Sequence, residues 1–320
     1  ILSNVLSQGG TVAELEEQLD GAIEYFSNSL NYGYNPDYDP RSIVGDDYSN
    51  VKERGYGNND AEGPDASHGT HVAGIIAAIR NNNIGIDGVA DHVRIMSVRA
   101  VPDGDERDKD VANAIIYAVD NGAKVINMSF GKGYAWNKEA VDKAVKYARK
   151  HDVLLVHAAG NSSQNNDETD NFPNDTYAKR GFLGLGPKQA DNWLEIGALS
   201  WKKGEDAPAT FSNYGKKSVD VFSPGVDIYS CVPQSDYATF SGTSMASPAT
   251  AGVAALIRAY YPEFTAQEVR QIILDSAIPQ NYKVKKPGSD ELVDFSELCA
   301  TGAIVNAYKA LQLAEERSKK

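Results

Sequence analysis

The stretch from Pro248 to Ile257 constrains the fold most, because it is small or apolar on every face of a helix. A helix without a polar face crosses a protein interior rather than lying on its surface. Proline is tolerated in a first helical turn, so Pro248 predicts that this helix begins near Thr243 or Ser244. Ser244 would then lie at a buried helix N-terminus, where free backbone N–H groups and the helix dipole favour negative charge on a substrate oxygen.

A second stretch of this kind, residues 67–78, is headed by His68 and ends near the run Asn81 to Asn83. Beyond it, apolar strands alternate with helices, a pattern typical of a parallel sheet covered on both faces. The fold class predicted is therefore α/β, three-layer, with a mostly parallel central sheet and helices on both faces. Strands are predicted at 93–98, 125–129, 153–158, 193–199, 219–222 and 226–231, and helices at 110–120, 137–150, 265–276 and 301–316.

The N-terminal part has a different character. Thr11 and Glu14 match a capping box, and apolar residues at helical spacing predict one amphipathic helix over 11–30. An irregular stretch follows to Asp65, with a short strand predicted at 43–47. The polar segment 162–191 is long enough to predict a functional surface loop.

Composition excludes several classes of protein. The chain has 320 residues, is 42% hydrophobic and has no apolar run of the roughly 18 residues that a membrane span requires. Its net charge of -13 argues against nucleic acid or an anionic membrane as a partner. Cys231 and Cys299 are too few for a disulfide scaffold or a cysteine-rich zinc site. One bridge and two buried thiols both remain open, with thiols favoured.

Three polar residues, His68, Asn161 and Ser244, fall at strand or helix ends, where sites gather in open parallel sheets. Taken singly, a serine in this position is most often a helix cap and a histidine among small residues a hydrogen-bonded core side chain. Together they supply a nucleophile, a base to activate it and an oxyanion donor.

Three segments, His68 to Gly74, Ala158 to Asn161 and Gly242 to Pro248, resemble the motifs of the subtilisin-like serine peptidases (subtilases), in the family's order. The resemblance extends from about Asn58 to Ala310. It includes the segments 127–131, 211–215, 223–228 and 302–307.

The resemblance implies peptide hydrolysis through an acyl-enzyme, with a polypeptide substrate. Ser244 would be the nucleophile, His68 the general base and then acid, and Asn161 the side-chain donor to the oxyanion. It also implies that two segments form the walls of the first specificity pocket: Ser129, Phe130 and Gly131, which would pair with substrate as an added strand, and Ala158, Ala159 and Gly160. No cofactor is required, and the expected location is secreted or periplasmic.

The family's catalytic aspartate is missing from this pattern. It ends a buried strand in a D-[ST]-G context upstream of the histidine helix, and none of the aspartates before His68 has that context: Asp20, Asp37, Asp39, Asp46, Asp47, Asp60 and Asp65. We therefore expect the aspartate strand upstream of Ile1. Residues 1–54 would be the tail of an insertion, and 55–320 a subtilisin-like catalytic domain lacking its first strand.

The missing aspartate leaves two hypotheses open. The chain is either the large fragment of a nicked, two-chain peptidase whose upstream fragment carries the aspartate, or a catalytically silent peptide-binding or scaffold protein. A zinc site at His68 and His71 lacks the H-E-x-x-H glutamate and a third ligand. Residues 131–133 imitate a dinucleotide loop but lack its third glycine. Asp103, Asp105, Asp108 and Asp110 could bind structural calcium, although a solvated acidic face is favoured.

Overall fold

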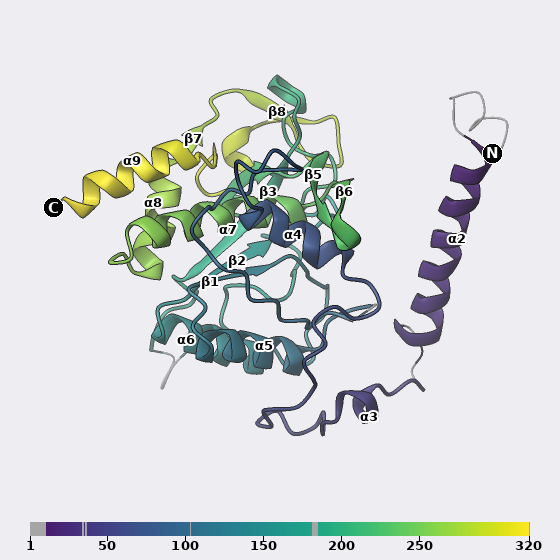
Figure 1. Ribbon diagram of the computed structural model, residues 1–320. Helices are drawn as coiled ribbons and strands as arrows, with labels where there is room; N and C mark the ends of the chain where they lie inside the picture. The colour runs from purple at the N-terminus through teal and green to yellow at the C-terminus, as the bar shows by residue number, and fades with distance from the viewer. Residues whose placement is uncertain (1–10, 34, 36, 103, 181–184, 320) are drawn as a thin grey trace. The chain divides into compact units, whose positions relative to one another are not determined.

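The computed structural model describes residues 11–33, 35, 37–102, 104–180 and 185–319. It divides into two compact units (Figure 1), one comprising residues up to Asn59 with Val101–Glu106, the other Asp60–Ala100 with Arg107–Lys320. The boundary between residues 54 and 55 drawn from the sequence remains a prediction.

The smaller unit contains the amphipathic helix predicted from the sequence. Helix α2 spans Val12–Asn28 and continues into a π-helical turn, Ser29–Gly33. Ile23 and Phe26 on α2 are each 62% exposed. The predicted capping box cannot be judged, because the side chain of Glu14 lies outside the described residues. The strand predicted at 43–47 is wrong: helix α3, Arg41–Val44, lies there and ends at Gly45, whose positive φ of 80° suits a residue without a Cβ.

The larger unit is built on a six-stranded sheet. Its order is β1 (Val125–Met128), β2 (Leu154–Ala158), β3 (Trp193–Leu199), β4 (Val221–Pro224), β10 (Ala303–Ile304) and β7 (Ile278–Pro279). The pairings from β1 to β10 are parallel, and β7 is antiparallel to β10. The predicted mostly parallel sheet is confirmed.

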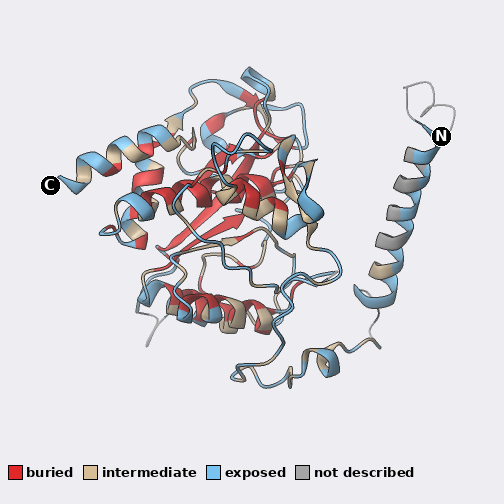
Figure 2. Ribbon diagram, in the orientation of Figure 1, coloured by how far each residue is buried: buried red, intermediate tan, exposed pale blue. Residues whose placement is uncertain are grey.

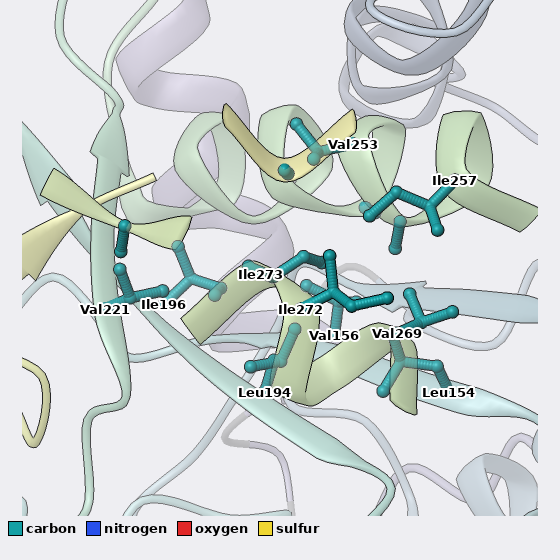
Figure 3. Packing of buried hydrophobic residues seen from close by; sticks show 14 of the residues in the cluster. Leu154, Val156, Leu194, Ile196, Val221, Val253, Ile257, Val269, Ile272 and Ile273 are labelled. Atoms are coloured by element: carbon teal, nitrogen blue, oxygen red, sulfur yellow. The ribbon is translucent and has the colours of Figure 1, made fainter. Parts of the chain in front are cut away.

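Helices cover both faces of this sheet. On one side, α5 (Asp108–Asp120) and α6 (Lys138–Lys150) pack on Leu155 and Trp193. On the other, α7 (Thr243–Tyr260) and α8 (Ala266–Ser276) pack on Leu154 and Val156, as Figure 3 shows. Alternate residues of β2 therefore enter different cores, because successive side chains of a strand point to opposite faces. Figure 2 shows buried residues concentrated in these layers.

The remaining elements surround the sheet. Helix α4 spans Ser67–Ala77, and the strand predicted at 226–231 is β5, Ile228–Val232, which pairs antiparallel with β6, Asp236–Phe240, in a separate hairpin. A second hairpin joins β8 (Lys283–Lys285) to β9 (Leu292–Asp294). Three 3₁₀ turns lie at Gly204–Asp206, Pro233–Ser235 and Phe295–Glu297.

The last helix, α9, spans Ala307–Ser318 and begins later than the predicted residue 301. Two features set this start. Ala303 and Ile304 are taken into the sheet as β10, and the Asn306 side chain caps the helix by accepting a hydrogen bond from the Lys309 N–H at 2.8 Å. The sequence prediction missed the short strand.

The strand predicted at 93–98 is wrong in this structure. These residues form no strand, and no backbone hydrogen bond between described residues involves them. Ile95 and Met96 are 48% and 40% exposed. A strand is stable only with a neighbour that satisfies its N–H and C=O groups, and none of the described strands lies against this segment.

None of the described helices has the length and apolar character to cross a membrane. Cys231 and Cys299 are both free thiols, Cys299 fully buried and Cys231 half-buried, and burial raises the pKa of the Cys299 thiol.

Candidate active site

Helix α7 begins at Thr243, as predicted, but Pro248 lies in its second turn rather than its first. Because Pro248 has no N–H, the Ser244 carbonyl loses its intrahelical donor four residues on. The Ser129 hydroxyl replaces that donor, with Oγ 2.9 Å from the Ser244 carbonyl oxygen. Pro248 thus frees an acceptor that ties the start of α7 to the loop after β1.

The tie to Ser129 belongs to a short chain of side-chain hydrogen bonds. Asn127 Nδ2 donates to Ser129 Oγ at 2.9 Å, and Ser247 Oγ donates to Asn127 Oδ1 at 2.7 Å. These bonds join the carboxyl end of β1 to the first turn of α7. The backbone around Ser244 is therefore held from outside its own helix.

Asn161 and the Ser244 N–H form a pair of donors around Gly242. The backbone N–H and the hydroxyl of Thr243 both donate to Asn161 Oδ1, at 2.8 and 2.9 Å. Since a backbone N–H can only donate, the atom it meets must be the amide oxygen, so Nδ2 faces the other way. A Cβ placed on Gly242 would lie 3.4 Å from Asn161 Nδ2 and 3.6 Å from the Ser244 nitrogen. The space beside Gly242 is thus bordered by both donors, as an oxyanion site requires.

His68 is the second residue of α4 and is exposed to solvent on one side. Partial burial lowers the pKa of its ring, nearby His71 lowers it further, and Asp65 acts in the opposite direction. Asp65 itself accepts a hydrogen bond from the Ser67 N–H at 2.8 Å, which stabilises the helix start. The neutral form of His68, which a general base needs, is therefore favoured.

His71 has a structural role rather than a metal-binding one. It is fully buried, its Nε2 lies 3.0 and 3.1 Å from the carbonyls of Ile228 and Ala238, and its ring stacks on Phe240. It thereby fastens α4 to the hairpin that leads into Ser244. Among the described residues, no three His, Cys, Asp or Glu side chains are grouped so that they could hold a metal ion.

The two catalytic candidates are not hydrogen-bonded to each other in this structure. Ser244 Oγ donates to the Ser129 carbonyl at 3.3 Å, and none of the described acidic side chains hydrogen-bonds to the His68 ring. Of the aspartates considered from the sequence, Asp46 pairs with Arg41 and Asp60 with Arg99. The region has a serine and a histidine at two helix starts but no described carboxylate that orients the histidine.

A pocket of about 390 Å³ opens beside Ser244. Four of the six predicted wall residues line it: Phe130, Gly131, Ala158 and Gly160. Ser129 and Ala159 do not, because the Ser129 side chain is bound to α7 and Ala159 is fully buried. Their assignment to the pocket walls remains a prediction.

Two asparagine side chains help to shape this pocket, in addition to the predicted wall residues. Asn171 Oδ1 would lie 2.8 Å from a Cβ on Gly131, so glycine is needed there for the close approach. Asn213 Oδ1 accepts from the N–H groups of Ser162 and Gln164, at 2.9 and 3.0 Å, and thereby orders the start of the predicted functional loop. Both asparagines line the pocket. Asn213 lies in the resembling segment 211–215, to which no pocket role was assigned, and no local pattern marked Asn171.

One of the four aspartates considered for calcium, Asp108, is bound by other residues of the chain. Asp108 is buried and pairs with Lys132, whose Nζ lies 2.8 Å from Oδ1, and its other oxygen accepts from the Asn137 N–H. Asp103 lies outside the described residues. Lys132 lines the pocket, and its ammonium group pairs with Asp108.

Comparison with known proteins agrees with this geometry. A family profile described as the subtilase family matches residues 11–298. The thermophilic serine proteinase of Bacillus sp. strain AK1 is 41% identical over 73% of this chain, which spans about half, 51%, of that protein. Thermitase of Thermoactinomyces vulgaris is 37% identical, covering 77% of this chain and 75% of that protein. Subtilisin DY of Bacillus licheniformis is 37% identical over 66% of this chain and 70% of its own.

Solved structures give the same fold. The protease domain of PatA, in an S218A mutant, superposes with a TM-score of 0.60 at 28% identity, covering 81% of this chain and 84% of that one. A structure that concerns the assembly of subtilase cytotoxin SubAB superposes with a TM-score of 0.64, covering 80% of this chain and 79% of that one. Its sequence identity of 24% supports the fold alone.

Proposed function

Because the chain belongs to the subtilase family and is a subtilisin-like serine peptidase in sequence and fold, we propose that it hydrolyses peptide bonds as a serine endopeptidase, through an acyl-enzyme on Ser244. The observation that carries the proposal is the pair of donors around Gly242. Asn161 Nδ2 and the Ser244 N–H border one space, next to a nucleophile and a pocket.

The proposed reaction follows the roles of these groups. His68 accepts the Ser244 proton as Oγ attacks the substrate carbonyl, and the carbonyl oxygen moves between the two donors. His68 then passes the proton to the leaving amine. A water repeats the sequence to release the acyl group. The side chain before the cleaved bond occupies the pocket that Phe130 and Gly160 line.

Covalent labelling tests this proposal. A fluorophosphonate is expected to label Ser244, and Ser244→Ala is expected to abolish labelling. Ser241→Ala is the matched control, because Ser241 is exposed and lies three residues away, with its hydroxyl bound by the Asp227 N–H at 2.9 Å. Labelling that survives Ser244→Ala, or is lost in Ser241→Ala, contradicts the assignment.

We propose further that the aspartate comes from a strand outside these 320 residues, which pairs with the free edge of β1. Two observations support it. The β1 residues Val125 and Ile126 are half-buried, whereas β2 and β3 are buried throughout, and parallel sheets are ordinarily covered and paired. Residues 93–98 have strand-forming side chains but no strand partner in the part of the chain that the structure describes. One added strand, with β1 on one side and residues 93–98 on the other, would cover the edge of β1 and give residues 93–98 a partner.

The added strand could belong to a separate fragment of a nicked enzyme. Intact mass of undenatured and denatured material is expected to reveal a companion peptide, and sequencing the chain that precedes Ile1 in the native product is expected to reveal D-[ST]-G. Amides of 93–98 should exchange with deuterium slowly in the two-chain form and fast in the single chain. Fast exchange in both, with no companion peptide, counts against the added strand.

A silent peptide-binding protein is the second candidate function. It is favoured by the absence of a hydrogen bond between His68 and Ser244 and of a described carboxylate at His68. Unpaired catalytic groups do not by themselves exclude activity, because such contacts often tighten only when substrate binds. Intact peptide affinity without hydrolysis, even with the upstream segment restored, would select this candidate.

We also propose that the enzyme needs no cofactor and acts outside the cytoplasm. The reaction uses no cofactor, so labelling is expected to persist in EDTA; loss of labelling that calcium restores would instead indicate a structural calcium site. The proposed location is outside the cytoplasm, secreted or periplasmic. The support is the likeness to the named bacterial proteinases, and fractionation of the producing cell tests it.

A further inference from the structure

His157 is a buried polar residue with no role in the proposed mechanism. It lies in β2, with no solvent exposure, in the face that packs on α5 and α6. By strand register it is flanked by Met128 of β1 and Glu195 of β3. The other side chains of β2 are Leu, Val and Ala. A buried imidazole in such a layer costs stability unless it is fully hydrogen-bonded.

Both nitrogens of His157 have partners, and their identity fixes the protons. Nε2 lies 2.7 Å from the Phe130 carbonyl oxygen, which can only accept, so Nε2 carries a hydrogen. Nδ1 lies 3.0 Å from both oxygens of the Glu195 carboxyl group, and Trp193 Nε1 donates to that group at 2.8 Å. The imidazole and the carboxyl group therefore share one further proton and are neutral as a pair.

The hydrogen bond from Nε2 ends on the backbone of a pocket wall. Phe130 and Gly131 line the pocket beside Ser244, and the preceding residue, Ser129, is bound to the Ser244 carbonyl. The segment 129–131 is thus held on three sides, by α7 at Ser129, by β2 and β3 at Phe130, and by Asn171 close to Gly131. Of these three contacts, only the one at Phe130 is made by a histidine that a buried carboxyl group orients.

We propose that His157, oriented by Glu195, is a positioning residue for substrate: its Nε2–H fixes the Phe130 carbonyl and thereby the peptide planes of the pocket wall. The inference rests on the proposed function, since it concerns the binding of peptide at the same site. His157 acts through Phe130 and does not touch the reacting atoms. Its loss should weaken ligands that lie along segment 129–131 and spare reagents that reach only Ser244.

Two readouts separate these effects. Peptide affinity is measured by calorimetry in a Ser244→Ala background, where no hydrolysis occurs, and the reactivity of Ser244 is measured with a small dialkyl fluorophosphate. In His157→Ala we expect peptide affinity to fall about tenfold, the effect of losing one hydrogen bond, and labelling to stay within about twofold. Labelling of the unsubstituted chain tests the proposed function separately.

Three further variants make the test specific. Val156→Ala also truncates a buried β2 side chain but faces the opposite core, so it should lower stability without changing peptide affinity. His157→Gln, whose amide can donate to the Phe130 carbonyl, should recover most of the affinity. Glu195→Gln keeps an acceptor for Trp193 and should change affinity by less than about threefold, because the Nε2–H remains.

Several results would overturn the proposal. They are an equal loss of peptide affinity in His157→Ala and Val156→Ala, a parallel fall in labelling in His157→Ala, and no recovery in His157→Gln. If His157→Ala does not fold, the comparison of His157→Gln with Glu195→Gln tests the proposal instead. A tenfold weakening of peptide binding in both variants would mean that His157 and Glu195 only stabilise the sheet.

Discussion

Replacing Gly242 with alanine should separate catalysis from stability. The added Cβ would lie 3.4 Å from Asn161 Nδ2, 3.6 Å from the Ser244 nitrogen and 3.7 Å from the Ser244 Cβ. These are ordinary van der Waals distances. The Gly242 backbone is extended, at φ 164° and ψ 161°, which an alanine also adopts. The fold should therefore accept the methyl group without strain.

The oxyanion cannot share this space with the methyl group. Each donor must come within about 2.7–3.1 Å of the developing oxyanion, and a donor beyond about 3.6 Å no longer bonds. A methyl carbon at 3.4 and 3.6 Å from the same two atoms displaces that oxygen from both. Loss of a single oxyanion donor costs subtilisin about 10²–10³ in turnover, a magnitude taken from that relative, so at least a hundredfold loss is expected here.

Stability should change in the opposite direction. A glycine replaced by alanine in a conformation that both adopt stabilises a protein by about 0.4–1 kcal/mol, because the unfolded chain loses freedom. In a chain of this size that is roughly 1–2 °C in Tm. The expected result is a Tm that is unchanged or slightly raised. The rate at which fluorophosphonate labels Ser244 and the rate of peptide turnover should both fall at least a hundredfold.

Gly69→Ala is the matched control for Gly242→Ala. Gly69 is next to His68 in α4, and a Cβ there would meet no heavy atom within 4 Å. This variant should keep full activity and gain up to about 1 kcal/mol from helix propensity. If Gly242→Ala retains labelling and turnover within a few-fold of the parent, or if Gly69→Ala loses as much, the space beside Gly242 does not hold the oxyanion.

Three further predictions follow from the same contacts. Thr243→Val keeps the shape of the side chain but removes the hydroxyl that donates to Asn161 Oδ1 at 2.9 Å. Because Asn161 is then held less firmly, kcat should fall about tenfold at unchanged KM, and an unchanged kcat would contradict this role of Thr243. Ser129→Ala should lower stability by about 1–3 kcal/mol, and Pro248→Ala should offset most of this by restoring an N–H to the Ser244 carbonyl, a coupling that a double-mutant cycle in urea measures. Since burial lowers the pKa of His68, the acid limb of Ser244 labelling should have its midpoint below 6.5, and a carboxylate supplied to the ring should move that midpoint to higher pH.

The lowered pKa values of His68 and His71 also make stability depend on pH. Burial of both rings favours the neutral form in the folded chain, so the unfolded chain binds more protons between the folded pKa and about 6.5. Stability from this source is complete above the unfolded value and is lost as the pH falls below it. Urea midpoints should therefore fall on acidification from pH 7, even before carboxylates titrate.

The sequence was sufficient for the strands β1 to β4, for the helices that cover them and for the residues that begin the two buried helices. Periodicity and helix-start signals are local, so they predicted the start of α7 near Thr243 or Ser244 and the strands 125–129 and 153–158, which the structure has at 125–128 and 154–158. The turn that contains Pro248 was misassigned, because the donor that makes a proline acceptable in a second turn, the Ser129 hydroxyl, is more than a hundred residues away. Nothing in the pattern around Pro248 identifies that partner.

The same distinction explains which pocket residues the sequence missed. The small residues of the walls belong to recognisable motifs, whereas Asn171 and Asn213 act through contacts with residues elsewhere in the chain. Ser129 shows that a motif leaves the direction of a side chain open: its hydroxyl donates to the Ser244 carbonyl on α7. A motif thus identifies a segment of the site, and the direction of each side chain depends on the partners that tertiary packing supplies.

The wrong strand at 93–98 is informative for the same reason. It is rich in the apolar and β-branched residues of a buried strand, yet Ile95 and Met96 are 48% and 40% exposed, and the segment has no ladder partner among the described residues. At the same time β1 is only half covered, and His68 has no described carboxylate to orient it. A strand added beside β1, parallel to it, would end at the same edge as Met128 and the loop that holds Ser244, because parallel strands share their carboxyl ends. An aspartate at that end would stand at the edge of the sheet where the proposed chemistry occurs, so a single segment would account for the unpaired strand pattern, the open edge and the missing third catalytic residue.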